Sequence, residues 1–190
     1  MKAGAGRILT ALPHQEAHSN NRPGSQLNTI ARYLLPQDVC LDFEVADKNA
    51  LFEAIGHHMQ REHGLPQHQI AHCLSRREQA GGTGVGEGVA IPHARIEGLG
   101  PIRAAYVRLV TPISFGAADG RPVSDVVVLL VPYPAADEHL QLLAETTRMF
   151  SDARFRASLH ASRDPQEVAR LFSQWPQSLL EKSVPARDRA

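Results

Sequence analysis

A run of six consecutive apolar residues, Val126 to Val131 (VVVLLV), limits the folds open to this chain more than any other feature. Four of the six are valine, which favours extended backbone, and the run suits the length of a strand. A strand without polar positions must be covered on both faces. The run therefore predicts the central strand of a sheet that has helices on both sides.

The length of 190 residues suits one domain with a full core and is short for two. Residues 1–25 are polar and show neither helical nor strand periodicity, and the chain becomes polar again from Pro176. We expect a flexible N-terminal arm (1–25), a single domain (26–175) and a flexible C-terminal tail (176–190).

Apolar residues at helical spacing, together with capping residues, predict helices on both sides of the central run in the sequence. The expected helices are Leu27–Leu35, stopped by Pro36; a helix capped by Asp47 and ended by Gly64; Pro66–Gln79; a helix capped by Asp137 with Leu140, Leu143, Ala144 and Thr147 on its inner face; and two short helices that begin at Ser151-Asp152 and Asp164-Pro165.

Further strands are expected at Val39–Val45, Ile102–Val110 and Ile113–Phe115, with Pro112 ending the second of these. Helices and strands are interspersed along the chain. The expected fold class is α/β (α+β): a single domain with a mixed parallel and antiparallel sheet of about five strands, flanked by helices.

The segment GGTGVGEGVAIPHARIE places four alternating glycines (Gly82 to Gly88) ahead of His93. Glycine reaches backbone angles closed to other residues, so such a run lets a large anionic group approach its amides. Pro92 fixes its own φ and pushes Ile91 toward extended conformations. His93 is therefore expected to leave a strand end in a defined direction, as a candidate reactive group.

Phosphoryl transfer to His93 is the chemistry that these residues suit. A neutral imidazole has a free ring nitrogen, and its ordinary pKa of about 6.5 leaves it mostly uncharged at neutral pH. Catalysis of this transfer consists mostly of positioning and positive potential. Arg77 can supply that potential, and the Thr83 hydroxyl and the glycine-run amides, Gly84 included, can bind phosphate oxygens.

His139 lies in the first turn of an expected helix. The positive end of the helix dipole favours its neutral form there, so it would act as a hydrogen-bond donor to phosphate.

Each of these residues also has a purely structural interpretation. Glycine runs mostly form turns, and this one lacks both the lysine of a P-loop and the spacing of a dinucleotide fingerprint. Arg77, between Arg76 and Glu78, suits a solvated helix face, and His139 suits a helix end. The spacing of these residues alone does not settle the function.

A metal site must also be considered, because ten histidines are many for a chain of this length. His68 and His72 are four residues apart on an expected helix, with Cys73 next to them, but no acidic partner has the spacing of a catalytic zinc site. We expect neither a metal nor an organic cofactor.

The remaining histidines and the cysteines are assigned no chemistry. His57, His58 and His63 are expected at the surface, and Cys40 and Cys73 are expected to be buried, inert thiols of a reducing compartment.

The composition argues against two classes of partner. Lysine plus arginine equals aspartate plus glutamate, at 20 each, so nucleic acid is not an expected partner. No apolar run approaches the roughly 20 residues that span a bilayer, so we expect a cytoplasmic protein without membrane insertion.

The motifs GTGVGEGVAIPHARIEG, TPISFGAADGRPVSDVVVLLVP and EHLQLLA, in this order and at these separations, resemble the phosphotransferase system enzyme IIA domains of the mannitol/fructose class. The resemblance covers Leu27 to Trp175 and is greatest to the nitrogen-regulatory members. It implies a mixed sheet flanked by helices. It also implies that His93 is phosphorylated by a histidine phosphocarrier protein, with His139 and Arg77 completing the site.

In the nitrogen-regulatory members the phosphate acts as a signal, and the resemblance implies potassium-transport or sensor-kinase regulatory proteins as partners. This chain departs from the family in having Gly82 where a serine is usual, so Thr83 or backbone amides must replace one donor. Three alternatives remain: a sugar-specific enzyme IIA that passes phosphate to a IIB domain, an interaction module that binds partners without phosphorylation, and a histidine-ligated metalloenzyme.

Overall fold

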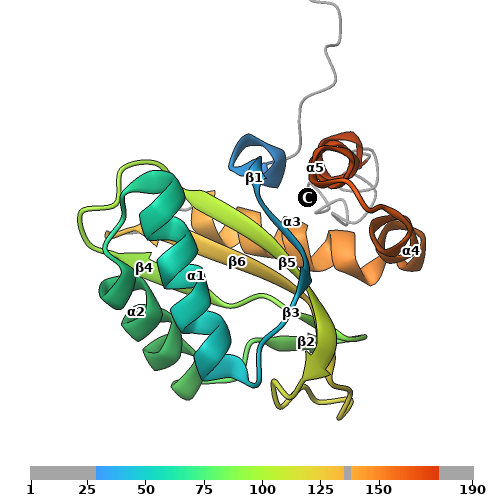
Figure 1. The fold of residues 1–190 in the computed structure, drawn as a ribbon, viewed down its shortest axis with the longest axis horizontal. Helices are drawn as coiled ribbons and strands as arrows, with labels where there is room; N and C mark the ends of the chain where they lie inside the picture. The colour runs from blue at the N-terminus through green and yellow to red at the C-terminus, as the bar shows by residue number, and fades with distance from the viewer. Residues whose placement is uncertain (1–28, 135–137, 176–190) are drawn as a thin grey trace, which may run out of the picture.

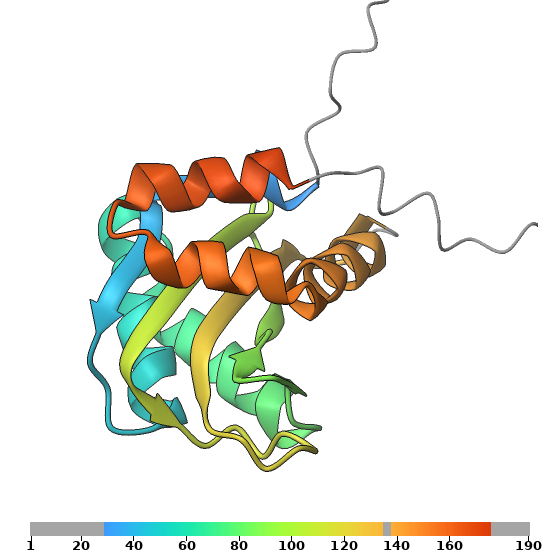
Figure 2. The same cartoon turned by 90° about the vertical axis from the view of Figure 1, so that its right-hand side faces the viewer.

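The computed structural model describes residues 29–134 and 138–175. In this part of the chain a six-stranded mixed sheet lies between two layers of helices (Figure 1). Two helices cover one face of the sheet, and three lie on the other (Figure 2). The helices are α1 (Lys48–His63) and α2 (Gln67–Gln79) on the first face, and α3 (Glu138–Ser151), α4 (Ala153–Ala161) and α5 (Pro165–Gln174) on the second.

The strands run in the order β1-β5-β6-β3-β2, and β4 also pairs with β6. Their bounds are β1 (Leu34–Phe43), β2 (Gly84–Gly86), β3 (Val89–Ala90), β4 (His93–Ile96), β5 (Arg103–Ile113) and β6 (Val123–Pro132). β5 pairs antiparallel with β6, whereas β3 and β4 both run parallel to it. The sheet is therefore mixed, as the sequence predicts, with one strand more than expected.

β6 is the central strand that the apolar run predicts. Val127, Leu129 and Val131 lie in the hydrophobic core under α3, α4 and α5, and the residues alternating with them lie in the core under α1 and α2. Successive side chains of a strand point to opposite faces, so one uninterrupted apolar run can supply both cores.

The helix expected from Leu27 to Leu35 is wrong in its described part. Ile30–Arg32 form a single 3-10 turn (η1), and β1 begins at Leu34. β1 is an edge strand parallel to β5, and Pro36 lies where their register shifts. An edge strand tolerates proline at such an irregularity because no partner needs its missing N–H. Pairing with β5 thus outweighs the helical spacing of the local sequence.

Pro112 does not end the following strand. β5 continues through it to Ile113, with a register shift between Arg108 and Ile113 that accommodates the proline. The separate strand expected at Ile113–Phe115 is therefore the end of β5 and the first residues of a loop.

The inner face expected for α3 is also wrong. Leu140 is 65% exposed, and the side chains turned inward include His139 and Leu142. Glu145 is buried on this face as well, where its carboxylate accepts a hydrogen bond from the backbone N–H of Thr29 at 2.7 Å. A buried polar group of this kind is hydrogen-bonded in the fold. In the sequence it interrupts the apolar spacing from which the inner face of a helix is predicted.

The end signals expected for α1, α4 and α5 are confirmed. Asp47 accepts a hydrogen bond from Ala50 N at 2.9 Å, and Gly64 ends α1 with a φ of 67°. Asp152 and Asp164 cap α4 and α5. The expected cap at Asp137 lies outside the described residues, as do the N-terminal arm and the C-terminal tail.

None of the helices in residues 29–134 and 138–175 combines the length and the apolar character that a membrane span requires.

Candidate functional site

His93 lies where the chain resumes pairing with β6. β3 and β4 pair with successive parts of β6, and Ile91 and Pro92 separate them. The Nδ1 of His93 lies 2.9 Å from the carbonyl oxygen of Ile91. Because a carbonyl only accepts hydrogen bonds, Nδ1 must carry the proton. The other ring nitrogen, Nε2, is then unprotonated and can accept a hydrogen bond.

Arg77, in the last turn of α2, supports the same protonation state of His93. Its Nε donates to Nε2 of His93 at 3.0 Å, and its Nη1 donates to the carbonyl oxygen of Gly81 at 2.8 Å. An arginine has no acceptor, so the first bond requires an unprotonated Nε2. The Gly81 carbonyl holds the guanidinium in place at the start of the glycine run.

His139, the second residue of α3, faces His93 across the site. The two ring centroids are 5.7 Å apart, and the ring planes are tilted by 54°. His139 is only 6% exposed, and its Nδ1 has no hydrogen-bond partner in the described part of the chain. The structure thus brings together three of the residues singled out in the sequence, each from the end of a helix or the start of a strand.

Both imidazoles are kept neutral by their surroundings. Burial is the main cause that lowers the pKa of His93, and the charges of Arg77 and Arg95 add to it, against the opposing effect of the Ile91 hydrogen bond. Burial, followed by Arg95 and Arg77, lowers the pKa of His139. Desolvation and nearby cations both penalise a charged imidazole. At neutral pH each ring therefore keeps an unprotonated nitrogen.

Two hollows meet at His93 and Arg77. The larger, with a volume of about 550 Å³, is lined by Cys73, Arg76, Arg77, Ala80, His93, Ala94, Arg95, Tyr133 and His139. We call it the arginine cleft, because it contains three arginines and, among the residues that the structure describes, no acidic lining residue. The smaller, about 240 Å³, is lined by Arg77, Gly82, Thr83, Gly84, Val85, Ile91, His93, Leu143 and Thr147. We call it the glycine hollow.

Thr83 and Gly84 line the glycine hollow but are engaged within the fold. Thr83 is buried, and both its amide and its hydroxyl donate to the Glu78 carboxylate, at 3.0 and 2.6 Å. Gly84 pairs with Ala90, and a Cβ there would lie 3.0 Å from Cβ of Ala117. In the structure these residues anchor the β2–β3 hairpin beside His93, and the Thr83 donors are not free for an incoming anion.

Glu78 and Arg95 were not recognised in the sequence as parts of this region. Glu78 is buried and joins three segments, because its other carboxylate oxygen accepts from Lys48 Nζ of α1 at 3.0 Å. Nothing in the sequence marks Glu78 as buried. Arg95 could have been found, since residues two apart on a strand share a face and His93 is two residues before it.

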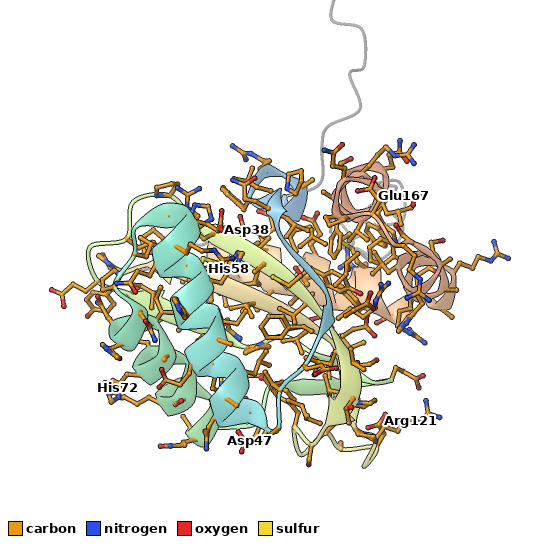
Figure 3. All side chains as sticks on the ribbon, viewed as in Figure 1. Asp38, Asp47, His58, His72, Arg121 and Glu167 are labelled. Atoms are coloured by element: carbon orange, nitrogen blue, oxygen red, sulfur yellow. The ribbon has the colours of Figure 1, made fainter. Side chains whose placement is uncertain are left out.

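The other histidines differ from expectation in part. His57, His68 and His72 are exposed, whereas His58 is buried and His63 is half-buried, and both bond the carboxylate of Asp38 of β1. Figure 3 shows Asp38 beside His58 of α1. Among the described residues no group of three potential ligands is arranged to hold a metal ion.

The two cysteines are half-buried rather than buried, and both are free thiols. Cys40 lies 4.0 Å from Nδ1 of His58, and Cys73 lines the arginine cleft.

Comparison with known proteins gives the family. The model described as phosphoenolpyruvate-dependent sugar phosphotransferase system, EIIA 2, matches residues 32–175. The nitrogen regulatory protein of Bradyrhizobium diazoefficiens is 33% identical over 73% of this chain and 91% of its own length. That of Pseudomonas aeruginosa is 35% identical, over 70% and 87%.

Comparison with solved structures supports the same family. The crystal structure of nitrogen regulatory protein IIA-Ntr from Neisseria meningitidis is 39% identical, with a TM-score of 0.71 over 75% of this chain and 98% of that one. IIA mannitol from Escherichia coli, at 18% identity and a TM-score of 0.59 over 72% of this chain and 96% of that one, shares the fold. The chain belongs to the type 2 enzyme IIA family of the sugar phosphotransferase system, and its nitrogen regulatory members are among its relatives.

Proposed function

We propose that this protein is phosphorylated on Nε2 of His93 by a histidine phosphocarrier protein and that the two phosphorylation states carry a regulatory signal. The observation that supports this most is the state of the His93 ring. Its proton is held on Nδ1 by the Ile91 carbonyl, and its Nε2 lone pair faces Arg77 at the edge of a cleft. Members of the family carry phosphoryl groups, which makes such a nitrogen a fitting acceptor.

In the proposed reaction the Nε2 lone pair forms a bond to phosphorus. The bond from phosphorus to the donor nitrogen breaks, and its electron pair returns to the donor imidazole. The transition state spreads negative charge over three equatorial oxygens, and the protein needs only to position the groups and stabilise this charge. No metal or cofactor takes part in this step.

Arg77 changes partner during the proposed transfer. In the unmodified protein its Nε hydrogen points at the Nε2 lone pair, which must become free for attack. The guanidinium can then bind the phosphoryl oxygens, and arginine suits this role because its fork matches two oxygens at once. The bond to Gly81 O keeps the side chain within reach of both positions.

His139 is proposed to position the phosphoryl group. Its ring is neutral and adjacent to His93, so it offers a hydrogen bond without adding a second positive charge. A buried nitrogen without a partner costs about 1–3 kcal/mol, and a hydrogen bond formed when phosphate binds would recover part of that cost. Thr83 and Gly84 are retained in the proposal as the support of the His93 loop. Their contact with phosphate would require Thr83 to leave Glu78.

A regulatory role is favoured by the names of the relatives at 33–39% identity, which are nitrogen regulatory proteins. A sugar-specific role, with phosphate passed to a IIB domain, is the alternative. The mannitol enzyme IIA has been solved in complex with phosphorylated IIB, but at 16% identity it shares only the fold with this chain. Transfer from the phosphorylated protein to a sugar-specific IIB domain would favour the alternative.

The primary test is incubation with a phosphorylated histidine carrier protein. We expect an acid-labile, base-stable adduct on the wild-type protein and none on His93→Ala. Labelling that persists in His93→Ala would overturn the proposal. Unaltered partner binding by His93→Ala and by a charge mimic would instead support an interaction module without phosphorylation.

A pull-down that compares the phosphorylated and unmodified forms tests the regulatory half of the proposal. Regulatory proteins of potassium transport and sensor kinases are the partners to examine first. Capture of the same proteins in equal amounts by both forms would remove the signalling role.

A further inference from the structure

A phosphoryl group on His93 could extend into either of the two hollows, and the glycine hollow suits it poorly. The side-chain hydroxyls that this hollow offers besides Arg77, those of Thr83 and Thr147, already donate to Glu78 and to the carbonyl oxygen of Leu143. Much of its wall is apolar, including Val85 and Leu143. A group with two negative charges is not stable against such a wall, because it would lose its hydration without gaining donors.

The arginine cleft offers what the glycine hollow lacks. Arg95 follows His93 by two residues on β4, and alternate residues of a strand share a face. Ala94 and Ile96, the residues of opposite phase, are buried in the core under α1 and α2. His93 and Arg95 therefore both project on the side away from that core, and both line the cleft.

The Arg95 guanidinium is also uncommitted. It is exposed, and within the described part of the chain it has neither a hydrogen bond nor an ion pair. Arg77, by contrast, already bonds His93 and Gly81. The cleft thus contains one arginine that holds the acceptor ring, Arg77, and two arginines, Arg95 and Arg76, whose side chains make no hydrogen bond or ion pair within the described residues; of these two, Arg95 is on the strand of His93.

We propose that Arg95 is a second phosphoryl-binding residue, so that the phosphoryl group on His93 lies in the arginine cleft between Arg77 and Arg95. This inference rests on the proposed phosphorylation of His93. It adds the direction that the phosphoryl group takes and a ligand that binds it.

The positive charge of Arg95 acts on both imidazoles, which supports a phosphoryl group positioned beside it in the cleft. Arg95 lowers the pKa of His93 and also that of His139, so its positive potential extends over both imidazoles. Arg76 lines the same cleft but is not among the groups that lower either pKa. The same potential that opposes a proton on these rings favours a negatively charged group between them.

The test compares Arg95→Ala with Arg76→Ala. Both variants remove one exposed arginine from the same cleft, so an effect of net charge alone would be equal in the two. Each protein is labelled with phosphoramidate, a small donor that loses ammonia when its nitrogen–phosphorus bond breaks. We expect Arg95→Ala to be labelled about 10-fold more slowly than wild type, the lower end for a lost hydrogen bond to a charged group. Arg76→Ala should stay within about 2-fold.

A second measurement separates binding of the phosphoryl group from docking of the donor. The equilibrium of phosphoryl exchange with the carrier protein should shift about 10-fold toward the carrier in Arg95→Ala, and Arg95→Lys should restore part of it, because lysine keeps the charge but not the fork. Thermal unfolding of all three variants should match wild type, because both arginines are exposed.

Equal effects of the two alanine variants would overturn the inference. So would slow labelling of Arg95→Ala by the carrier protein with normal labelling by phosphoramidate, because Arg95 would then contact the carrier. If wild type itself is not labelled on His93, the proposed function fails instead, so the two failures are distinguishable.

Discussion

Two pairs of histidines in this protein have opposite surroundings. His93 and His139 meet beside a cleft lined by arginines, where the pKa of each is lowered. His58 and His63 meet at the buried carboxylate of Asp38, where the hydrogen bond to Asp38 is the main cause that raises the pKa of His58 from 6.5 to about 9. His93 and His139 are thus held neutral, whereas Asp38 favours the charged form of His58, according to the sign of the neighbouring groups.

The difference also separates a reactive arrangement from a structural one. In the first pair a lone pair faces a cleft, whereas in the second both Nε2 atoms bond the same Oδ1 of Asp38, at 3.0 and 2.8 Å. These bonds join the C-terminal part of α1 to the edge strand β1. We therefore expect the first pair to control phosphorylation and the second to control stability, and each can be perturbed alone.

The largest expected effect is on stability, from Asp38→Ala. Removing one partner of a buried ion pair leaves the other charge unpaired and typically costs about 3–5 kcal/mol. Urea unfolding should show a loss of this size. Asp47→Ala is the matched control, because it removes the aspartate that caps the other end of the same helix, and it should cost only about 1 kcal/mol. Figure 3 labels both aspartates.

The rate at which Asp38→Ala is labelled on His93 tests whether the two histidine pairs are independent. If Asp38→Ala remains folded at low temperature, its labelling on His93 should stay within about 2-fold of wild type. A loss of labelling in a folded sample would show that the Asp38 cluster (Asp38, His58 and His63) also supports the cleft. The assignment of phosphorylation to one pair of histidines and stability to the other would then be wrong.

Arg77→Ala should produce the largest effect on phosphorylation among the residues around His93. Loss of one preorganised donor to transition-state charge costs about 100- to 1,000-fold in rate. The stability of the variant should change little, because Arg77 bonds only His93 and the Gly81 carbonyl in the described structure. Labelling rates with phosphorylated carrier protein measure the effect. A change below about 10-fold would mean that Arg77 orients the free ring and does not stabilise the transferred group.

The cleft pair was recognisable in the sequence because several local signals coincide there. A glycine run, a proline before His93 and the helix pattern that begins at His139 each limit the backbone locally. The central strand was recognisable for a similar reason, since six apolar residues permit few other environments.

The Asp38 cluster had no such signal, and His58 and His63 were wrongly assigned to the surface. Asp38 is 20 residues from His58 and 25 from His63, and only the packing of α1 on β1 brings them together. The helix expected at Leu27–Leu35 failed for the same reason, because the partner that made this segment a strand, β5, lies about 70 residues later in the chain. Long-range pairing overrides local propensity at these positions.

The pH dependence of stability gives the third test. The pKa of His58 is about 9 in the folded protein and 6.5 as its ordinary value, so the fold binds this proton more tightly. The resulting stabilisation is fully present below pH 6.5 and is lost as the pH rises to about 9, and it amounts to at most about 3 kcal/mol. Urea unfolding at pH 6 and pH 9 measures it. The Arg61 guanidinium lies 3.2 Å from Nδ1 of His58 and can donate only to an unprotonated Nδ1, so this contact competes with the second ring proton.

Asp38→Asn provides the control for this titration. It keeps the shape of the side chain but removes the charge that holds the proton on His58, so the dependence of its stability on pH between 6 and 9 should be smaller than in wild type. An equally steep dependence in Asp38→Asn would assign the titration to another group.

The smallest of these effects is expected for His139→Ala. If His139 only positions the phosphoryl group, the variant should still be labelled on His93, but about 10- to 100-fold more slowly, the scale of one lost transition-state hydrogen bond. His139→Gln should recover part of the rate, because an amide can also donate a hydrogen bond. Since the pKa of both imidazoles in the cleft is lowered, labelling of wild type should fall less between pH 8 and pH 6.5 than it would for a histidine of ordinary pKa. Complete loss of labelling in a folded His139→Ala would show that His139 does more than position the phosphoryl group. Phosphoryl transfer would then require both imidazoles of the cleft, just as the stability of the Asp38 cluster requires its carboxylate.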